Sequence, residues 1–424
     1  MYCQINDVIL QSMLTTAIQQ HKLERDRTLA ATTIPRELLN KTLPQMESSL
    51  IKVITGPRRA GKSVFAFQLL HGRDFGYVNF DDERLTGLAD FDELMRSVVA
   101  VYGAVTTLLF DEIQNVPSWE LIVNRLQRNG FNLVITGSNA HLLSRELGTH
   151  LTGRYLEFRL LPFSFREYLA AKDADPADEP MVQHHFTAWL HTGGYPEVVV
   201  NNISLETYLP TLFDSILFKD IVRRYRVKYP QKIHELAHYL TTNHSCEYTC
   251  NALKGALGFR SVHTVENYVA YLAESFLFFP VERYSTKLKE LLKAPRKGYA
   301  IDLGLIEAIK FKQQPDTGRL LENAVAIELF RQRADFYSYK SASGKETDFV
   351  IRTGITTSEL IQVTLETTSP KTLKREMSGI LAAARDLSCS QLTVLTGNET
   401  WEKSDDGLTV RALPVWKWLL TCKR

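Results

Sequence analysis

Cysteine is scarce in this sequence, and long hydrophobic runs are absent. The 424 residues include five cysteines, too few and too scattered for a disulfide framework, so a reducing compartment fits best. The longest run without a charged or amide side chain, residues 98–110, is shorter than the roughly 20 residues of a membrane-spanning helix. The N-terminal residues, MYCQINDVIL, lack the basic leader and apolar stretch of a secretion signal. We therefore expect a cytoplasmic protein with no membrane partner.

Neither sign of charge dominates, and no fixed-period repeat is visible. Lysine and arginine number 50 and aspartate and glutamate 48, which gives a formal net charge of +2. This balance excludes a globally basic nucleic-acid coat protein but leaves room for a local basic face. The lack of repeats argues against solenoids and propellers. Because a single hydrophobic core stops growing at roughly 250–300 residues, the chain should form several domains.

Strands alternate with helices over residues 50–136, after helical segments at 6–24 and 35–46. The alternation predicts a parallel sheet with crossover helices. The acidic, proline-containing stretch 172–180 indicates one domain boundary, and residues 313–318 indicate a second. The predicted domains are a sheet domain with N-terminal helices (1–171), a largely helical domain (172–312) and a separate α/β domain (313–424).

A phosphate-binding loop follows the first predicted strand, IKVIT. The loop sequence GPRRAGKS matches GxxxxGK[ST] and stands between a strand and a helix, which is the context that this motif requires. Backbone N–H groups of such a loop, together with the positive end of the following helix, bind phosphate oxygens. We expect Lys62 to hold the β- and γ-phosphates of ATP and Ser63 to ligate Mg²⁺. The predicted nucleotide contacts are Gly56, Pro57, Arg58, Arg59, Ala60, Gly61, Lys62, Ser63 and Val64.

Two carboxylates end a later apolar strand, in the sequence LLFDE. We expect Asp111 to hold Mg²⁺ together with Ser63, and Glu112 to polarise the attacking water. Burial in a sheet explains the apolar residues of this strand but not two acids at its end. The pair, combined with the upstream loop, therefore favours hydrolysis of ATP.

Other polar residues are candidates for contacts with the γ-phosphate. Ser138 and Asn139 end the next predicted strand, where either could contact the γ-phosphate or the water, although a plain turn explains them equally well. Arg154 could reach the γ-phosphate of a neighbouring subunit and stabilise charge in the transition state. Arg145 is its rival, and a solvated surface role is the alternative for both.

Further motifs accompany the loop and the acids, among them LLFDEIQNVPSWE, LTGRYLEFRLLPFSFREYL, GGYPEVV, FKDIVRRYRV, KGYAIDLGL, LENAVAIEL and GKETDFVI. With them the chain resembles, from about residue 51 onward, the prokaryotic AAA-type ATP-binding proteins that carry a C-terminal domain of unknown function. The resemblance implies an α/β fold with an AAA-type P-loop domain. It also implies that residues 56–63 are Walker A, that Asp111 and Glu112 are Walker B, that Ser138 and Asn139 occupy the sensor-1 position, and that Arg154 is the arginine finger.

The middle of the chain has the pattern of a winged helix-turn-helix. Helices at 251–258 and 262–279 flank a tight turn, and a hairpin is predicted over 280–301. Basic residues around this pattern would give salt-sensitive DNA binding with little sequence specificity. Glu266 and Glu274 weaken base reading by the second helix, and packing against the ATPase or a partner is the alternative. The basic residues of the predicted wing include Lys297, and the predicted DNA contacts are Arg223, Arg224, Arg226, Arg283, Lys287, Lys289 and Lys293.

Histidine and cysteine also gather in this block. A zinc site would need ligands from the set His234, His238, His244, Cys246 and Cys250. Structural zinc sites favour closer, paired spacing with turn residues. We therefore expect ordinary core and surface roles for these side chains.

The third domain has the residue order of a PD-(D/E)xK nuclease. Glu322 lies on a predicted helix, Asp348 at the head of a strand, and Gln362 on the following strand. Such a site needs oxygen ligands for Mg²⁺ and a lysine that orients water. Thr364 stands where the lysine is expected, so the site is degenerate.

A lysine from elsewhere would be needed to restore this nuclease-like site. Lys345 and Lys371 are the candidates, but positioning to within about an ångström decides such chemistry. We therefore expect a nuclease-like fold that is retained for binding DNA or other subunits.

Together these patterns predict a Mg²⁺- and ATP-dependent AAA-type ATPase. We expect a homo-oligomer, such as a hexameric ring, that binds duplex or branched DNA as a motor or remodeller. Two alternatives stay open: a nucleotide-dependent switch that regulates a protein partner in signalling or defence, and an ATP-regulated nuclease. Stimulation of ATP hydrolysis by DNA favours the motor, and ATP-dependent binding to a protein favours the switch.

Overall fold

The computed structural model describes the backbone of residues 2–88, 90–138, 153–285, 287, 290–291, 294–310 and 316–422, and their side chains from residue 11 onward. The chain divides into two compact units, residues 1–161 and 162–424. The second unit contains α7 (Phe165–Ala171), which packs against α8 (Glu179–Thr192), so the division precedes the boundary expected at 172–180. Both the second and the third predicted domains lie within this unit, and their separation near residue 313 stays a prediction.

The first unit is built on a five-stranded sheet with the order β2-β3-β4-β1-β5, in which all strands are parallel. Leu108 and Phe110 of β3 pack in one core cluster, and Leu109 between them packs in the other. Burial on both faces explains why the strands are continuous apolar runs rather than alternating ones. The predicted parallel sheet is confirmed, with strands β1 (Ile51–Thr55), β2 (Gly76–Asn79), β3 (Thr107–Asp111), β4 (Asn132–Gly137) and β5 (Tyr155–Arg159).

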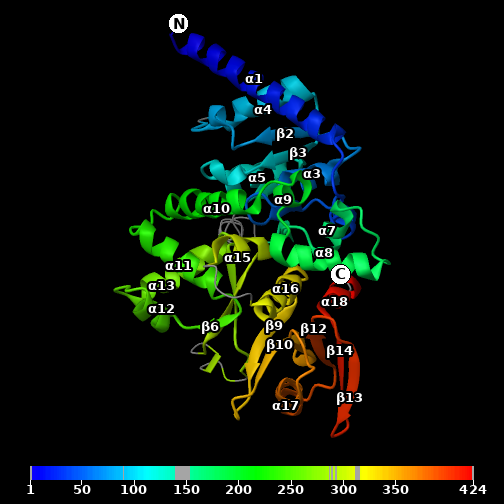
Figure 1. Ribbon diagram of the computed structural model, residues 1–424. Helices are drawn as coiled ribbons and strands as arrows, with labels where there is room; N and C mark the ends of the chain where they lie inside the picture. The colour runs from blue at the N-terminus through cyan, green and yellow to red at the C-terminus, as the bar shows by residue number, and fades with distance from the viewer. Residues whose placement is uncertain are drawn as a thin grey trace. The chain divides into compact units, whose positions relative to one another are not determined.

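Helices pack on this sheet, as the blue and cyan part of Figure 1 shows. Leu14 and Ile18 of the N-terminal helix share a core cluster with residues of α4 and α5. Helix α4 was not expected from the sequence; Asp90 caps it by accepting hydrogen bonds from two backbone N–H groups. The helices are α1 (Tyr2–Ala30), α2 (Leu39–Thr42), α3 (Lys62–Leu70), α4 (Phe91–Tyr102) and α5 (Trp119–Arg128).

The second unit begins with helices that are held together by a buried aspartate. The Asp302 carboxylate accepts hydrogen bonds from the backbone N–H groups of Gly194 (2.7 Å) and Leu305 (3.2 Å). A Cβ added to Gly193 would lie 2.3 Å from the same carboxylate. The motifs GGYPEVV and KGYAIDLGL therefore meet in a packing role. The remaining helices are α9 (Pro196–Asn201), α10 (Leu205–Ser215), a π-helical stretch (Ile216–Val222), α11 (Pro230–Thr242) and α15 (Leu303–Ile309).

A small antiparallel sheet with the order β6-β8-β7 follows in the middle of the chain. The predicted hairpin is present as β7 (Phe278–Val281) paired with β8 (Arg296–Ala300). The two helices of the predicted helix-turn-helix are α12 (Cys250–Ala256) and α13 (Val262–Glu274), and β6 (Cys246–Tyr248) precedes them.

The C-terminal part is a six-stranded mixed sheet with the order β13-β14-β12-β11-β10-β9. Strands β13 and β14 and helix α18 were not expected from the sequence. The elements are α16 (Thr317–Arg331), β9 (Asp335–Lys340), β10 (Glu346–Thr353), β11 (Thr356–Val363), α17 (Pro370–Leu387), β12 (Leu392–Thr396), β13 (Trp401–Asp405), β14 (Leu408–Pro414) and α18 (Val415–Thr421). Throughout the described part of the chain, no helix has the length and apolar character needed to cross a membrane.

Candidate nucleotide site and acidic pocket

The phosphate-binding loop joins β1 to α3 at the carboxyl end of the parallel sheet. Gly56 has φ of 150°, and a Cβ there would lie 1.9 Å from the carbonyl oxygen of Leu160, so only glycine fits. Gly61 has φ of 89° directly before Lys62, the first residue of α3. The loop therefore runs directly into the N-terminus of a nine-residue helix. The backbone N–H groups of such a loop and of the first helical turn bind phosphate oxygens.

Lys62 turns back over this loop and faces the acids at the end of β3. Its buried Nζ donates to the carbonyl oxygen of Pro57 at 3.1 Å and lies 3.7 Å from Glu112 Oε1. An ammonium held over the loop in this way can bind the β- and γ-phosphates of a nucleotide.

Asp111 is buried at the end of β3 and lies against the loop serine. Its carboxylate accepts hydrogen bonds from the side chains of Ser63 and Thr136, and Tyr77 Oη donates to it at 3.4 Å. Burial and the neighbouring Glu112 raise the pKa of Asp111 to about 6, although the bonds from Ser63 and Thr136 oppose the shift. Because the Ser63 hydroxyl and the Asp111 carboxylate are in contact, these residues fit a shared Mg²⁺ site.

Glu112 follows in a left-handed backbone conformation, with φ of 52°, which turns its side chain towards the loop. Burial alone would raise the pKa of this carboxyl group, but Lys62, a hydrogen bond from Gln114 and the charge of Arg58 together lower it. Glu112 is therefore a carboxylate at neutral pH that can accept a hydrogen bond from water.

Two further residues support the site and are not among the contacts that the sequence predicts. The buried Thr136 hydroxyl accepts from the Glu112 backbone N–H at 3.0 Å and donates to Asp111, so it fixes both acids. Arg36 donates to the carbonyl oxygens of Ala60 (2.9 Å) and Leu161 (2.6 Å), which ties the preceding segment to the loop. The IPR triplet around Arg36 carries no motif that predicts this contact, whereas Thr136 was visible as the polar residue ending a strand beside β3.

The residues predicted to contact the γ-phosphate are only partly placed. Ser138 is buried directly after β4, at the same edge of the sheet as the loop. Asn139 and Arg145 lie outside the described residues. Arg154 precedes β5, whose Tyr155 pairs with Ile51, so it stands at the opposite end of the sheet from the loop that follows Thr55. Its guanidinium donates to the Asn124 side chain of α5.

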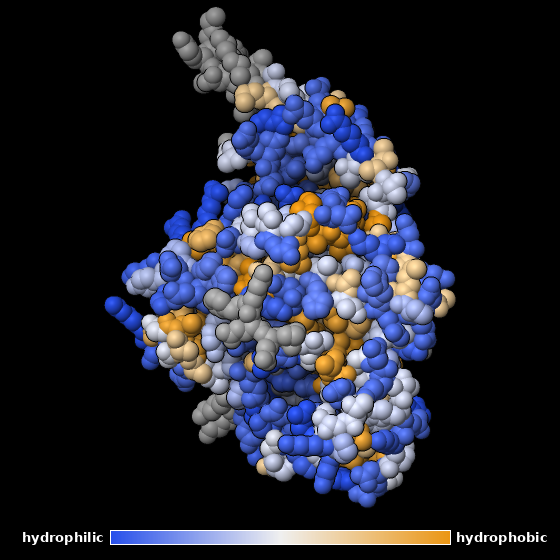
Figure 2. Space-filling view, viewed as in Figure 1, coloured by the Kyte–Doolittle hydropathy of each residue, from blue (hydrophilic) through white to orange (hydrophobic). Residues whose placement is uncertain are grey.

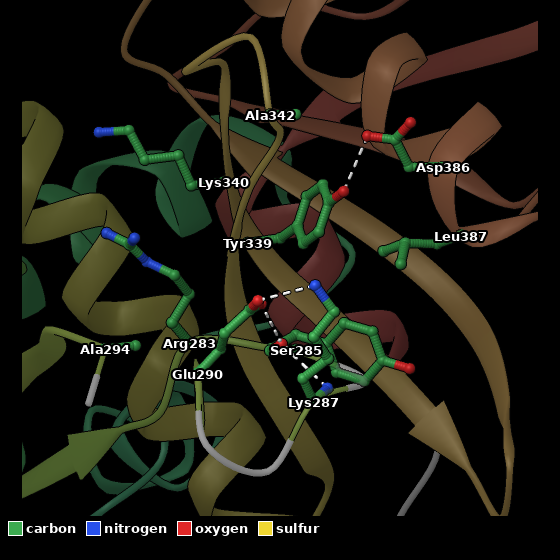
Figure 3. Close-up of a pocket in the computed structure, with 11 residues that line it drawn as sticks. Arg283, Ser285, Lys287, Glu290, Ala294, Tyr339, Lys340, Ala342, Asp386 and Leu387 are labelled. Atoms are coloured by element: carbon green, nitrogen blue, oxygen red, sulfur yellow. Dashed lines mark hydrogen bonds and ion pairs between the residues drawn. The ribbon is translucent and has the colours of Figure 1, made fainter. Parts of the chain in front are cut away.

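Some of the predicted DNA contacts form ion pairs with carboxylates, and others do not. Arg283 forms an ion pair with Glu247, and Lys287 forms one with Glu290 at 2.9 Å. Figure 3 shows both basic residues on the wall of a surface cavity of about 710 Å³, together with Lys340. Across the described ranges, no carboxylate forms an ion pair with the basic residues that follow the π-helical stretch, Arg223, Arg224 and Arg226. The remaining predicted contacts, Lys289 and Lys293, lie outside the described residues.

Lys297, expected on the basic wing, is instead buried in the nuclease-like site, and this corrects its predicted exposure. Its Nζ lies 2.9 Å from Glu322 Oε1 and 2.9 Å from Asp348 Oδ1. Burial would lower the pKa of this lysine, but the two carboxylates outweigh it and raise the pKa. Burial and Asp348 raise the pKa of Glu322 to about 7. The predicted acids Glu322 and Asp348 are therefore brought together around an ammonium.

The other predicted residues of this site are less involved. Gln362 Oε1 accepts from the Asp348 backbone N–H at 3.3 Å, and Thr364 donates to the carbonyl oxygen of Glu366. Lys345 lines a second cavity, which also contains Glu322 and Asp348, but it makes no described contact with the two acids. Lys371 is exposed in the first turn of α17. The alternative zinc ligands are not assembled either, because no group of three or more His, Cys, Asp or Glu side chains in the described ranges could hold a metal ion.

Comparison with known proteins finds family matches over three stretches of the chain. Residues 48–169 match the family described as AAA domain, and residues 183–316 and 317–418 match two families described as domains of unknown function, DUF8612 and DUF4143. The sheet order, the loop and this match define an AAA-type P-loop ATP-binding protein. The chain belongs to the same family as the uncharacterized protein MJ1544 of Methanocaldococcus jannaschii, with which it is 32% identical over 418 residues, covering 92% of each chain.

Two other proteins are similar to the chain. An uncharacterized protein of Haemophilus influenzae is 34% identical over 332 residues, covering 74% of this chain and 82% of the relative. The Walker-type ATPase PABY2304 of Pyrococcus abyssi has a solved structure that is 14% identical, with a TM-score of 0.43, covering 65% of this chain and 96% of that one. Neither comparison names a substrate or a partner.

Proposed function

We propose that the protein hydrolyses ATP with Mg²⁺ at the loop between β1 and α3. The carrying observation is the convergence of four side chains at one end of the sheet: Lys62, Ser63, Asp111 and Glu112. Bound Mg²⁺ would neutralise charge on the β- and γ-phosphates, and Ser63 and Asp111 would hold it. Glu112, unprotonated at neutral pH, would accept a hydrogen bond from the attacking water and align it.

Lys62 connects nucleotide binding to the contacts of Glu112, because the same ammonium faces both the phosphate site and the glutamate. In this structure its ammonium lies 3.7 Å from the glutamate. Phosphate oxygens would compete for that ammonium and free Glu112 to face water. Replacing Lys62 by alanine should abolish binding of a fluorescent ATP analogue, whereas replacing the exposed Lys41 of α2 should leave it unchanged. ATP binding by Lys62→Ala at wild-type affinity would overturn the proposal.

We propose further that the protein is a homo-oligomer in which Arg154 acts on the neighbouring subunit's nucleotide. Supporting this, Arg154 stands at the far end of the sheet from its own loop, about 20 Å away at 3.3 Å per strand residue. It contacts Asn124 of α5, one turn beyond Leu121, which is 53% exposed. Figure 2 shows other apolar patches scattered over a largely hydrophilic face.

Mixing two inactive variants tests this arrangement. Arg154→Ala and Glu112→Gln should each hydrolyse ATP poorly alone. In an equal mixture, a site with an intact Glu112 can receive Arg154 from its neighbour, so about a quarter of the wild-type rate should return if subunits exchange freely. Refolding the variants together ensures exchange. No recovery in mixed particles, or a normal rate for Arg154→Ala alone, would contradict the assignment.

The DNA-binding motor or remodeller is the function we propose for the whole chain. Two observations support it. The order of α11, β6, α12, α13, β7 and β8, with β8 between the other two strands, is that expected of a winged helix-turn-helix. Arg223 and Arg226 are also exposed without ion pairs in the described part of the chain, so their charges are available for phosphates.

The paired and unpaired cations provide a matched test. Replacing Arg223 and Arg226 together by alanine should weaken binding of duplex and four-way DNA and reduce its salt dependence by about two charges. Replacing Lys287, which already pairs with Glu290 at 2.9 Å, should change binding less. If the wild-type protein binds no DNA at low salt and ATP instead promotes binding of a protein partner, the nucleotide-dependent switch is the correct function.

A further inference from the structure

A cavity of about 690 Å³ opens in the second unit at the nuclease-like site. Its wall combines strand β8 of the small sheet with α16, β10 and β11 of the C-terminal part. The side chains at its centre are Lys297, Glu322 and Asp348, and all three are largely buried. A nuclease of this residue order would place a divalent cation between the two acids.

The lysine uses the oxygen atoms that such a cation would need. Its Nζ is 2.9 Å from one oxygen of each acid, and Tyr299 Oη donates to the same Glu322 oxygen at 2.7 Å. The second oxygen of Asp348 accepts from the Val363 backbone N–H at 2.9 Å. Three of the four carboxylate oxygens of these acids therefore accept hydrogen bonds from the chain itself.

The residues present do not fit Mg²⁺ as a third partner. The lysine of a nuclease orients water beside the metal, but Lys297 bonds both acids directly, at 2.9 Å from each, so its ammonium stands in the place between them that the metal would take. The third ligand position holds Gln362, which is uncharged and whose side-chain oxygen already accepts from Asp348.

We propose that the Lys297 ammonium takes the place of the divalent cation, so that this pocket is a metal-free charge centre that joins β8 to α16 and β10. The Lys297 side chain lies in this pocket and not on the basic wing, and its charge offsets one of the two buried negative charges. The centre thereby couples the candidate DNA-binding sheet to the C-terminal sheet. The wild-type pocket accordingly does not cut phosphodiesters.

Moving Lys297 out of the pocket would be costly, which is why a metal does not simply displace it. The side chain is 7% exposed, and its departure would leave two neighbouring carboxylates without their cation. Replacing it by a neutral side chain of similar length, Lys297→Met, should therefore lower the melting temperature by about 10 °C. It should also expose a latent cation site formed by Glu322 and Asp348.

Calorimetric titration of Mn²⁺ into the nucleotide-free full chain tests the proposal. Wild type and Asp348→Asn should give the same isotherm, because any Mn²⁺ at the phosphate loop is common to both. Lys297→Met should gain a site at least tenfold tighter than any in the wild-type pocket, since the repelling charge is gone. The gain should disappear when Asp348→Asn is added. Tyr299→Phe is the matched control that keeps the ammonium, and it should gain none.

Three results would decide whether the pocket takes a divalent cation. Mn²⁺ binding by the wild type that Asp348→Asn removes would overturn the proposal, as would plasmid cleavage with Mg²⁺ or Mn²⁺ that the same variant abolishes. A folded Lys297→Met that acquires no Mn²⁺ site would show that the acids do not form a cation site at all. If Lys297→Met does not fold, the comparison of wild type with Asp348→Asn, in titration and in cleavage, still tests whether the pocket takes a metal.

Discussion

Thr136 offers a sharp test of how the acids are held, because one hydroxyl serves both of them. Replacing it by valine keeps the shape but removes the bond donated to Asp111 and leaves the Glu112 N–H without its acceptor. A hydrogen bond to a charged group contributes about 1.5–3 kcal/mol, and an unsatisfied buried donor costs about 1–3 kcal/mol. We therefore expect a loss of about 4 kcal/mol in the first unit, or a fall of about 10 °C in its melting temperature.

Loss of the hydroxyl should also impair hydrolysis. Without Thr136 the pKa of Asp111 should rise further above about 6, because that bond favours the ionised form. With both acids less well fixed, kcat/KM in a phosphate-release assay at 20 °C should fall by about tenfold to a hundredfold.

Thr396 is a matched control in the second unit. Its buried hydroxyl also donates one hydrogen bond and accepts one: it donates to the backbone carbonyl oxygen of Glu399 at 2.7 Å and accepts from the N–H of the same residue at 2.9 Å. Thr396→Val should destabilise the protein without changing kcat/KM. Equal effects of the two valine variants on hydrolysis, or a normal rate for Thr136→Val, would refute the view that Thr136 fixes the acids.

Three other outcomes are expected at the same site. Glu112→Gln should bind ATP as tightly as wild type yet hydrolyse it at least a hundredfold more slowly, since the amide cannot accept the proton of water. Nucleotide retained on a filter measures binding, and phosphate release measures hydrolysis. An unchanged rate would exclude Glu112 as the base. Gly56→Ala should lose ATP binding, because its Cβ would lie 1.9 Å from the Leu160 carbonyl oxygen. Gly72→Ala, which also has a positive φ but no atom near the added Cβ, should bind normally, and equilibrium dialysis compares the two. Finally, kcat/KM should fall as the pH drops through about 6, because protonation of Asp111 would remove the carboxylate proposed to hold Mg²⁺. A flat profile down to pH 5 would argue against that role.

The nucleotide site could be predicted from sequence because its signals are local. The residues from Gly56 to Ser63 are contiguous, and Asp111 and Glu112 end a strand whose apolar residues announce burial on both faces. Parallel strands bring their carboxyl ends to one edge, so the meeting of loop and acids follows from the order of elements. Helix α4 was missed although Asp90 caps it, because its apolar residues run into the uncharged stretch before β3 and blur the helical period.

In the second unit, the contacts of the basic residues could not be predicted from local sequence. Lys297 was grouped with the wing because its neighbours in sequence are basic, and nothing local indicates that β8 turns this one side chain towards Glu322 and Asp348. Those contacts span 25 and 51 residues of chain, and only tertiary packing creates them. The ion pairs that neutralise Arg283 and Lys287 were equally invisible in a count of basic residues. A cluster of cations in sequence is therefore weaker evidence for a basic face than the same cluster in a structure.

The central claim is that the loop and the acids of the first unit hydrolyse ATP with Mg²⁺. The most direct measurement is phosphate release from ATP by the purified full chain, with Mg²⁺ and with excess EDTA, alongside the Asp111→Asn variant. We predict steady release by the wild type that requires Mg²⁺ and falls at least a hundredfold in the variant. Release that persists in EDTA or in Asp111→Asn would contradict the account.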